Sequence, residues 1–139
     1  MTRKPALDHI GIAVDSIDSG LAIYRSLGIE VEDVEEVADQ KVRVAFLPVG
    51  ETRIELLEPT DDTSPIARHL DRRGAGLHHI CLRVADIRAA MGQLSEEGYR
   101  LLSEEPLRGA HDCLVCFVHP KSAGGVLIEL SQRLGESDE

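Results

Sequence analysis

Across most of residues 7–14, branched aliphatic side chains alternate with small or polar ones, which is the pattern of a β-strand with one buried face. The alternation puts Ile10, Ile12 and Val14 on one face and His9, with small residues, on the other. We expect the aliphatic face to pack against a helix. The opposite face then holds a histidine, which is a first candidate for chemistry.

A helical pattern follows this strand and extends to about residue 27. Either Asp15 or Ser16 can cap its start, and Gly28 stands where a helix commonly ends in glycine. Ser64 and Pro65 predict the start of another helix. The apolar stripe of the first helix consists of Ile17, Leu21 and Tyr24, and strands are predicted at about 30–37, 42–48 and 52–58, with Gly50 in the last hairpin.

The same order of elements recurs in the second half of the chain. His79 lies 70 residues after His9 in a similar strand, and Glu129 lies 74 residues after Glu55. We expect a strand at 77–84, a helix at 86–97 ended by Gly98, and strands near 100–103, 113–119 and 125–132. The pattern is βαβββ twice, and it predicts one domain over 1–139 made of two repeats, about 7–60 and 77–132.

Length and charge narrow the classes of function. A chain of 139 residues is long enough for one domain with a sizeable core. The net charge of −10 argues against a nucleic-acid partner. No apolar run approaches 18 residues and no signal-peptide pattern follows Met1, so we expect no membrane association and a cytoplasmic location. The spacing of Cys113 and Cys116 resembles a redox motif, but buried strand thiols are the favoured interpretation.

The repeated histidines and glutamates suggest a metal site. By alternation all four side chains, His9, Glu55, His79 and Glu129, project from the side of the sheet that the helices leave open. A lone strand histidine is usually structural and a lone strand glutamate is usually solvated. Matched pairs in two repeats are better explained by a shared divalent cation, because buried carboxylates need a partner.

Two nitrogens and two oxygens suit Zn²⁺, Co²⁺, Ni²⁺, Fe²⁺ or Mn²⁺ better than Mg²⁺ or Ca²⁺. The remaining coordination positions would be open to water or substrate. His78, by parity, is expected to point toward the helix side or the strand edge, as a packing or hydrogen-bonding residue.

The residues of both repeats resemble the vicinal oxygen chelate superfamily, and within it the methylmalonyl-CoA epimerase family. The resemblance extends from Leu7 to Gln132. It rests on Leu7-Asp8-His9-Ile10-Gly11-Ile12-Ala13-Val14, Gln40-Lys41-Val42-Arg43-Val44-Ala45-Phe46, Ile54-Glu55-Leu56-Leu57-Glu58-Pro59, Ser64-Pro65-Ile66-Ala67, Gly76-Leu77-His78-His79-Ile80, Ser103-Glu104-Glu105-Pro106, His119-Pro120-Lys121-Ser122 and Gly124-Gly125-Val126-Leu127-Ile128-Glu129-Leu130.

This resemblance implies an α+β fold in which two βαβββ modules form an open, eight-stranded, barrel-like sheet around a metal site. It implies an isomerase that interconverts (R)- and (S)-methylmalonyl-CoA through an enolate. We expect one divalent ion per subunit, Co²⁺ in the first place, and a homodimer. Gln40, Lys121 and Ser122 are the residues expected to bind the acyl-CoA substrate.

Three positions depart from the family's usual pattern. Several bacterial members have a glutamate where this chain has Val44, and a glutamine where it has Glu55. A valine cannot move a proton, so we expect Glu55 and Glu129 to form the acid/base pair as well as to bind the metal. Lys41 stands where a glycine is usual, beside the pocket.

Two other functions are compatible with such a sequence. One is a glyoxalase I-type lactoylglutathione lyase, which uses a similar metal set. The other is a metal-free protein that binds an antibiotic or another small molecule. Proteins of that second kind often use aromatic surfaces, whereas this chain has two Phe, two Tyr and no Trp.

Overall fold

The computed structural model describes residues 4–135, which divide into two compact units. The first unit is His9–His78, and the second joins residues 4–8 to residues 79–135. The boundary therefore falls inside the first strand, between Asp8 and His9. Within residues 4–135, no helix combines the length and the apolar character needed to cross a membrane.

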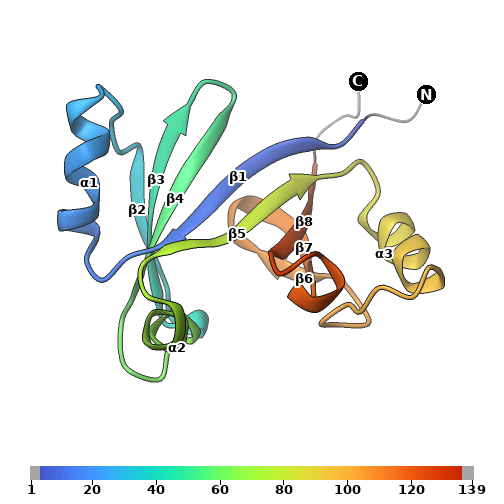
Figure 1. The fold of residues 1–139 in the computed structure, drawn as a ribbon. Coiled ribbons are helices and arrows are strands. Elements are labelled where there is room, and N and C mark those ends of the chain that lie inside the picture. Colours follow the sequence, from blue (N-terminus) through green and yellow to red (C-terminus); the bar gives the residue numbers. More distant parts are fainter. Residues whose placement is uncertain (1–3, 136–139) are drawn as a thin grey trace. The chain divides into compact units, whose positions relative to one another are not determined.

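The first module is a four-stranded sheet with a parallel pair at one edge. Its strands follow the order β2-β3-β4-β1, and β1 runs parallel to β4 while the other neighbours are antiparallel (Figure 1). The elements are β1 (Ala6–Ala13), α1 (Ile17–Ser26), β2 (Asp33–Val37), β3 (Val42–Val49) and β4 (Thr52–Pro59), followed by α2 (Pro65–Arg73).

The second module repeats this plan. Its strands follow the order β5-β8-β7-β6, again with a parallel pair, β5 and β8, at one edge. The elements are β5 (Gly76–Arg83), α3 (Ile87–Glu96), β6 (Leu107–Gly109), β7 (Cys113–Val118) and β8 (Leu127–Arg133). The predicted fold class, α+β with two βαβββ modules and eight strands, is confirmed.

The helix starts predicted from sequence are present. The Ser16 side chain accepts a hydrogen bond from the Ser19 N–H, which selects Ser16 over Asp15 as the cap of α1. Ser64 caps α2 in the same way, with Pro65 in the first position. Asp86 caps α3 by accepting from Ala89 N–H. Each cap satisfies one of the N–H groups that a helix start leaves free.

The two faces of the first sheet are both covered in part. Helix α1 packs Ile17 and Leu21 against Leu47 and Leu56 on one face. The other face, which carries His9 and Glu55, is called here the histidine face. Contrary to the sequence-based expectation that helices leave it open, α2 packs on it through Ile66. The partners of Ile66 in that cluster are Ala13, Val42, Val44, Phe46 and Leu57.

One predicted strand is wrong. Residues 100–103 form only an isolated bridge between Leu101 and Val118, and the edge strand β6 lies later in the chain. The Ser103 hydroxyl donates to the Glu105 carbonyl and bends the chain there. Pro106 has no N–H to donate, so regular pairing with β7 starts only after it, at Leu107.

Candidate functional site

His9 and Glu55 form a buried pair on the histidine face of the first unit. Strands β1 and β4 are parallel neighbours with Gly11 opposite Glu55, so His9 lies two residues before that point on the same face. His9 Nδ1 is 3.3 Å from Glu55 Oε2. Only 6% of His9 and 7% of Glu55 is exposed, so the charge of the carboxylate requires a nearby partner.

The His9–Glu55 pair is called here the first half-site, and the His79–Glu129 pair of the second unit is called the second half-site. Arg53 contacts both residues of the first half-site, and the sequence analysis did not identify it. Its Nε donates to Glu55 Oε2 at 2.8 Å, and its Nη2 lies 2.8 Å from the same oxygen. Nη2 is also 3.3 Å from His9 Nδ1. The guanidinium carbon lies 5.7 Å from the centre of the Phe46 ring. Strand parity could have revealed Arg53, because it is two residues before Glu55 and shares its face.

Val44 and Phe46 line the strand beside this half-site. Phe46 lies opposite Glu55 across the β3–β4 ladder, and Val44 lies opposite Leu57. Both are almost fully buried, and Val44 packs in the apolar cluster under α2. The position where several family members carry a glutamate is therefore a hydrocarbon surface in this chain.

The second unit holds an equivalent pair. His79 Nε2 is 3.2 Å from Glu129 Oε1. In the β5–β8 pairing Cys81 lies opposite Glu129, which repeats the register of Gly11 and Glu55 in the first unit. Leu127 stands two residues before Glu129, where the first unit has Arg53. The prediction that both pairs meet around one metal ion stays a prediction.

The three cysteines of the second unit, all within the described residues, form no disulfide. Cys81 and Cys116 are buried, whereas Cys113 is half-buried. Burial raises the pKa of the Cys116 thiol to about 11, with further contributions from the charges of Glu129 and Cys81 against an opposing hydrogen bond from the Leu130 backbone. At neutral pH Cys116 is therefore protonated and a poor nucleophile, as expected for a buried strand thiol.

The three residues expected to bind substrate lie in two short turns. Gln40 is exposed at the end of the turn Ala38–Gln40 in the first unit. Lys121 and Ser122 lie in the turn Pro120–Ser122 of the second unit, where Lys121 is exposed and Ser122 Oγ accepts from Arg100 N–H. Their contact with substrate stays a prediction.

Lys41 adopts a left-handed backbone conformation. Its φ is +55°, in the region that glycine occupies at no steric cost. The glycine usual in the family would fit this position, which explains the preference. In this chain the Lys41 ammonium group hydrogen-bonds to the Thr63 hydroxyl.

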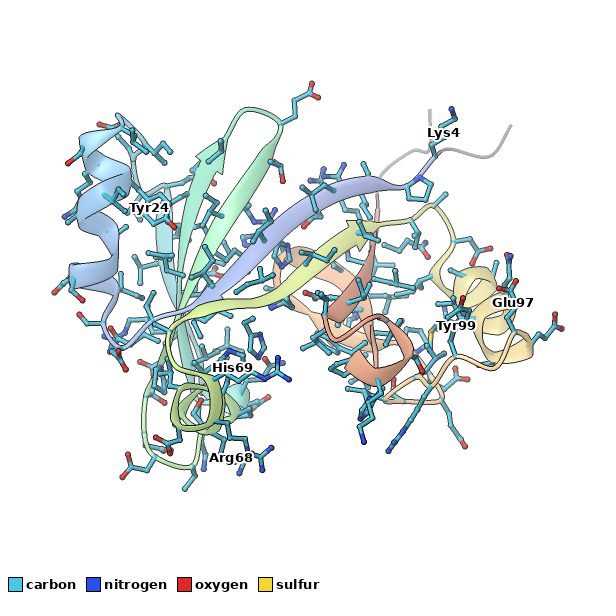
Figure 2. The ribbon with its side chains drawn as sticks, viewed as in Figure 1. Lys4, Tyr24, Arg68, His69, Glu97 and Tyr99 are labelled. Carbon is cyan, nitrogen blue, oxygen red and sulfur yellow. The ribbon has the colours of Figure 1, made fainter. Side chains whose placement is uncertain are left out.

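His78 packs against His69 of α2, which agrees with the packing role that the sequence suggests for it. The two ring centres are 4.9 Å apart and the rings meet edge to face. Burial lowers the pKa of His69, and the charge of Arg73 lowers it further. Figure 2 labels His69 on α2. Neither ring belongs to the predicted ligand set.

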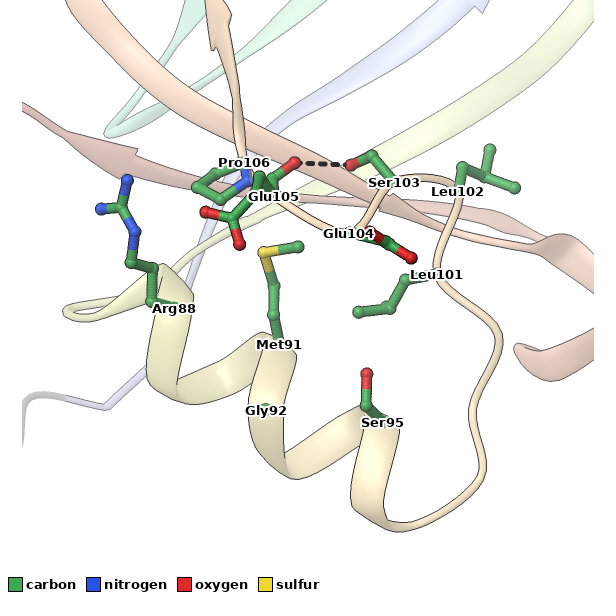
Figure 3. Close-up of a pocket in the computed structure, with 10 residues that line it drawn as sticks. All are labelled: Arg88, Met91, Gly92, Ser95, Leu101, Leu102, Ser103, Glu104, Glu105 and Pro106. Atoms are coloured by element: carbon green, nitrogen blue, oxygen red, sulfur yellow. Dashed lines mark hydrogen bonds between the residues drawn. The ribbon is translucent and has the colours of Figure 1, made fainter.

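A separate pocket lies in the second unit between α3 and the segment that follows it (Figure 3). Its volume is about 490 Å³, and none of the predicted site residues lines it. Met91 and Leu101 supply apolar surface, whereas Arg88 and Glu104 supply charge. The full lining is Arg88, Met91, Gly92, Ser95, Leu101, Leu102, Ser103, Glu104, Glu105 and Pro106.

Two βαβββ modules, each with a histidine–glutamate pair on one sheet face, agree with the family that the sequence matches. The match to the Glyoxalase/Bleomycin resistance protein/Dioxygenase superfamily covers residues 8–117, and the chain belongs to this superfamily. Among curated proteins, the chain is 46% identical to the ethylmalonyl-CoA/methylmalonyl-CoA epimerase of Cereibacter sphaeroides, over 91% of this chain and 96% of that protein. It is 43% identical to the mitochondrial methylmalonyl-CoA epimerase of Homo sapiens, over 91% of this chain and 73% of that protein.

Solved structures extend the likeness to nearly the whole chain. A hypothetical protein from Bacillus halodurans matches with a TM-score of 0.92 at 40% identity, over 99% of this chain and 100% of that one. A variant of the Streptomyces coelicolor methylmalonyl-CoA epimerase in complex with 2-nitronate-propionyl-CoA matches with a TM-score of 0.88 at 35% identity, over 96% and 98%. The resemblance to methylmalonyl-CoA epimerases that the sequence predicts is confirmed.

Proposed function

We propose that this chain is an isomerase that interconverts the two C2 epimers of methylmalonyl-CoA. The observation that carries the proposal is the buried histidine–glutamate pair, repeated in the same strand register in both modules. It occurs in a chain 43–46% identical to proteins named as epimerases of this substrate class. One module supplies one carboxylate, and epimerisation needs a proton-transferring group on each face of a planar intermediate.

The chemistry assigns a task to each glutamate. The C2 proton lies between a thioester carbonyl and a carboxylate, so its removal gives an enolate whose charge spreads onto the thioester oxygen. One of Glu55 and Glu129 takes this proton, and the other, protonated, returns one on the opposite face. Both side chains are mostly shielded from solvent, which limits competing proton transfer with bulk water.

The donor set fits a divalent metal ion. His9, Glu55, His79 and Glu129 offer two imidazole nitrogens and two carboxylates, each mostly removed from solvent. Such mixed donors suit Co²⁺, Zn²⁺, Ni²⁺, Mn²⁺ or Fe²⁺, and we propose Co²⁺ first. When bound, such an ion supplies Lewis-acid stabilisation for the charge that develops on the thioester oxygen.

We propose the CoA contacts at the exposed turns. Lys121 carries the charge that a phosphate requires, and Ser122 and Gln40 offer neutral hydrogen-bonding groups. The relative from Cereibacter sphaeroides is named for both ethylmalonyl-CoA and methylmalonyl-CoA. A single extra methylene is discriminated weakly in an apolar site, so we expect turnover of both substrates within about a hundredfold of each other.

The decisive experiment follows the C2 proton. Wild type, Glu55→Gln and Glu129→Gln are incubated with each methylmalonyl-CoA epimer in D₂O, and deuterium uptake and epimer ratio are measured by NMR. Each glutamine variant should lose epimerisation by about 10²–10⁴-fold, because an amide cannot exchange the proton. A variant that still exchanges deuterium with one epimer identifies the face served by the remaining glutamate.

The control for this experiment is Glu51→Gln, an exposed position in the β3–β4 hairpin, which should keep full activity. Full activity of both site variants would refute the acid/base assignment. Turnover of the methylglyoxal–glutathione adduct by wild type, without C2 exchange of methylmalonyl-CoA, would favour the lyase alternative. If the wild-type protein binds neither Co²⁺ nor either of the two substrates, the alternative of a metal-free binding protein is favoured.

We also propose a homodimer, a single domain and a cytoplasmic location. A homodimer is tested by light scattering, and the single domain is tested by whether both modules unfold in one transition. A cytoplasmic location also stays a proposal, and the human relative carries the word mitochondrial in its name.

A further inference from the structure

We propose that Arg53 competes with the metal ion for the first half-site and thereby sets the metal affinity of this chain. The inference rests on the proposed function, because it requires that His9 and Glu55 are metal ligands. It concerns Arg53, which contacts both side chains at once.

The contact with His9 leads to competition in either tautomer. A guanidinium can only donate, so a hydrogen bond from Arg53 Nη2 to His9 Nδ1 requires a lone pair on Nδ1. If His9 binds metal through Nδ1, the ion takes that lone pair. If it binds through Nε2, the ring proton must sit on Nδ1, which then faces the Arg53 donor. In both cases Arg53 has to give up the contact with His9.

The contact with Glu55 adds an electrostatic term of the same sign. Two Arg53 nitrogens lie 2.8 Å from a single oxygen, Oε2, so the guanidinium neutralises the buried carboxylate. A divalent cation brought to the same carboxylate meets this fixed positive charge in a site that is mostly shielded from water. The ion pair therefore stabilises the first half-site in the metal-free protein and opposes metal binding.

The second module has an apolar residue at the position equivalent to Arg53. Leu127 occupies the position two residues before Glu129 that Arg53 occupies before Glu55. Because Leu127 and Arg53 hold equivalent places in the two modules, a substitution at Leu127 is a matched control. When the Arg53 guanidinium moves away from His9, it can still stack on the Phe46 ring, because the two groups are already in contact.

The test measures Co²⁺ binding by calorimetry in wild type, Arg53→Met, Arg53→Lys and Leu127→Met. Arg53→Met removes the charge and keeps an unbranched side chain, and it should bind Co²⁺ about tenfold tighter, at the lower end of the effects seen for residues around metal ligands. Arg53→Lys keeps the charge and should stay within about threefold of wild type. Leu127→Met conserves volume and should leave the affinity unchanged.

Two further readouts separate competition from a merely structural role. The rise in melting temperature on adding Co²⁺ should be larger in Arg53→Met than in wild type, because metal stabilises through its affinity for the folded state. The visible bands of bound Co²⁺ should be the same in both, since the ligands do not change. Equal or weaker Co²⁺ binding in Arg53→Met overturns the inference but leaves the metal site standing. Absence of Co²⁺ binding in all four proteins overturns the metal site itself.

Discussion

The two half-sites have the same strand register and differ in the residue that stands two positions before the glutamate. Each has a glutamate on the strand parallel to the one that carries its histidine, in identical register. The first adds Arg53, whereas the second has Leu127 at that place. A duplicated fold can therefore present the same ligand types twice while changing the residue two positions before each glutamate.

The same contrast extends to the helix starts. Glu58 Oε1 accepts from Ile17 N–H at the start of α1, at 2.7 Å. Gln132, at the equivalent place in β8, accepts from Ile87 N–H at the start of α3, at 2.9 Å. The geometry is preserved and the charge is not, so the backbone arrangement does not depend on a carboxylate. Substitutions at paired positions can therefore separate what the fold requires from what each module's chemistry requires.

The largest expected contrast concerns the two phenylalanines that face the glutamates. Phe46 lies opposite Glu55 and is 3% exposed, whereas Phe117 lies opposite Glu129 and is only half-buried. Phe46→Ala should cost about 3–5 kcal/mol of unfolding free energy through the cavity it leaves. Phe117→Ala should cost about 1–2 kcal/mol, because less apolar area is lost. Urea unfolding measures both, and equal losses would contradict the difference in burial.

A smaller contrast is expected at the helix starts. Gln132→Glu places a negative charge at the N-terminus of α3 and should stabilise the protein by about 0.3–1 kcal/mol at low salt. Glu58→Gln removes that charge from α1, together with the ion pair to Arg43, and should destabilise it by about 1 kcal/mol.

Salt dependence provides the check on these helix variants. The effects of both substitutions should shrink in 1 M NaCl, where charges are screened. Gln40→Glu is the control for added charge, since Gln40 lies at the end and not at the start of a helical turn. An equal gain in Gln40→Glu would show that the gain at position 132 has nothing to do with the helix.

The smallest expected effect concerns α2, the helix of the first unit that follows β4. Burial lowers the pKa of His69 below its ordinary value of 6.5, so the unfolded chain binds this proton more readily than the folded one. Stability should therefore fall as the pH drops below about 6.5. His69→Asn should lose part of this pH dependence of the melting temperature between pH 7 and pH 5. An unchanged slope would mean that other groups account for it.

Much of the fold follows from local sequence, and the exceptions have physical causes. The strands around His9 and His79, the cap at Ser64 and the positive φ of Gly28 and Gly98 agree with prediction, because each depends on neighbouring residues alone. The displaced β6 depends on a bend at residues 103–106 that alternation does not encode.

The candidate site was predictable in part for the same reason. Strand parity placed His9 and Glu55 on one face, as observed. Strand parity also places Arg53 on this face. A positively charged guanidinium is not expected beside a cation site, so the sequence alone gives no reason to include Arg53 in the site. Ile66 of α2 packs on that face through tertiary contacts, and no local sequence pattern predicts this packing.

The boundary inside β1 has a consequence for cutting this chain into pieces. Asp8 belongs to the second unit, where its Oδ1 accepts from Arg83 at 3.0 Å and lies 3.8 Å from Arg133. A fragment starting at residue 79 would have both arginines and no Asp8. A contiguous C-terminal half therefore lacks a partner that the second unit uses, whereas residues 9–78 keep the first unit whole. A circular permutant that places residues 1–8 after residue 139 would keep each unit in one continuous piece.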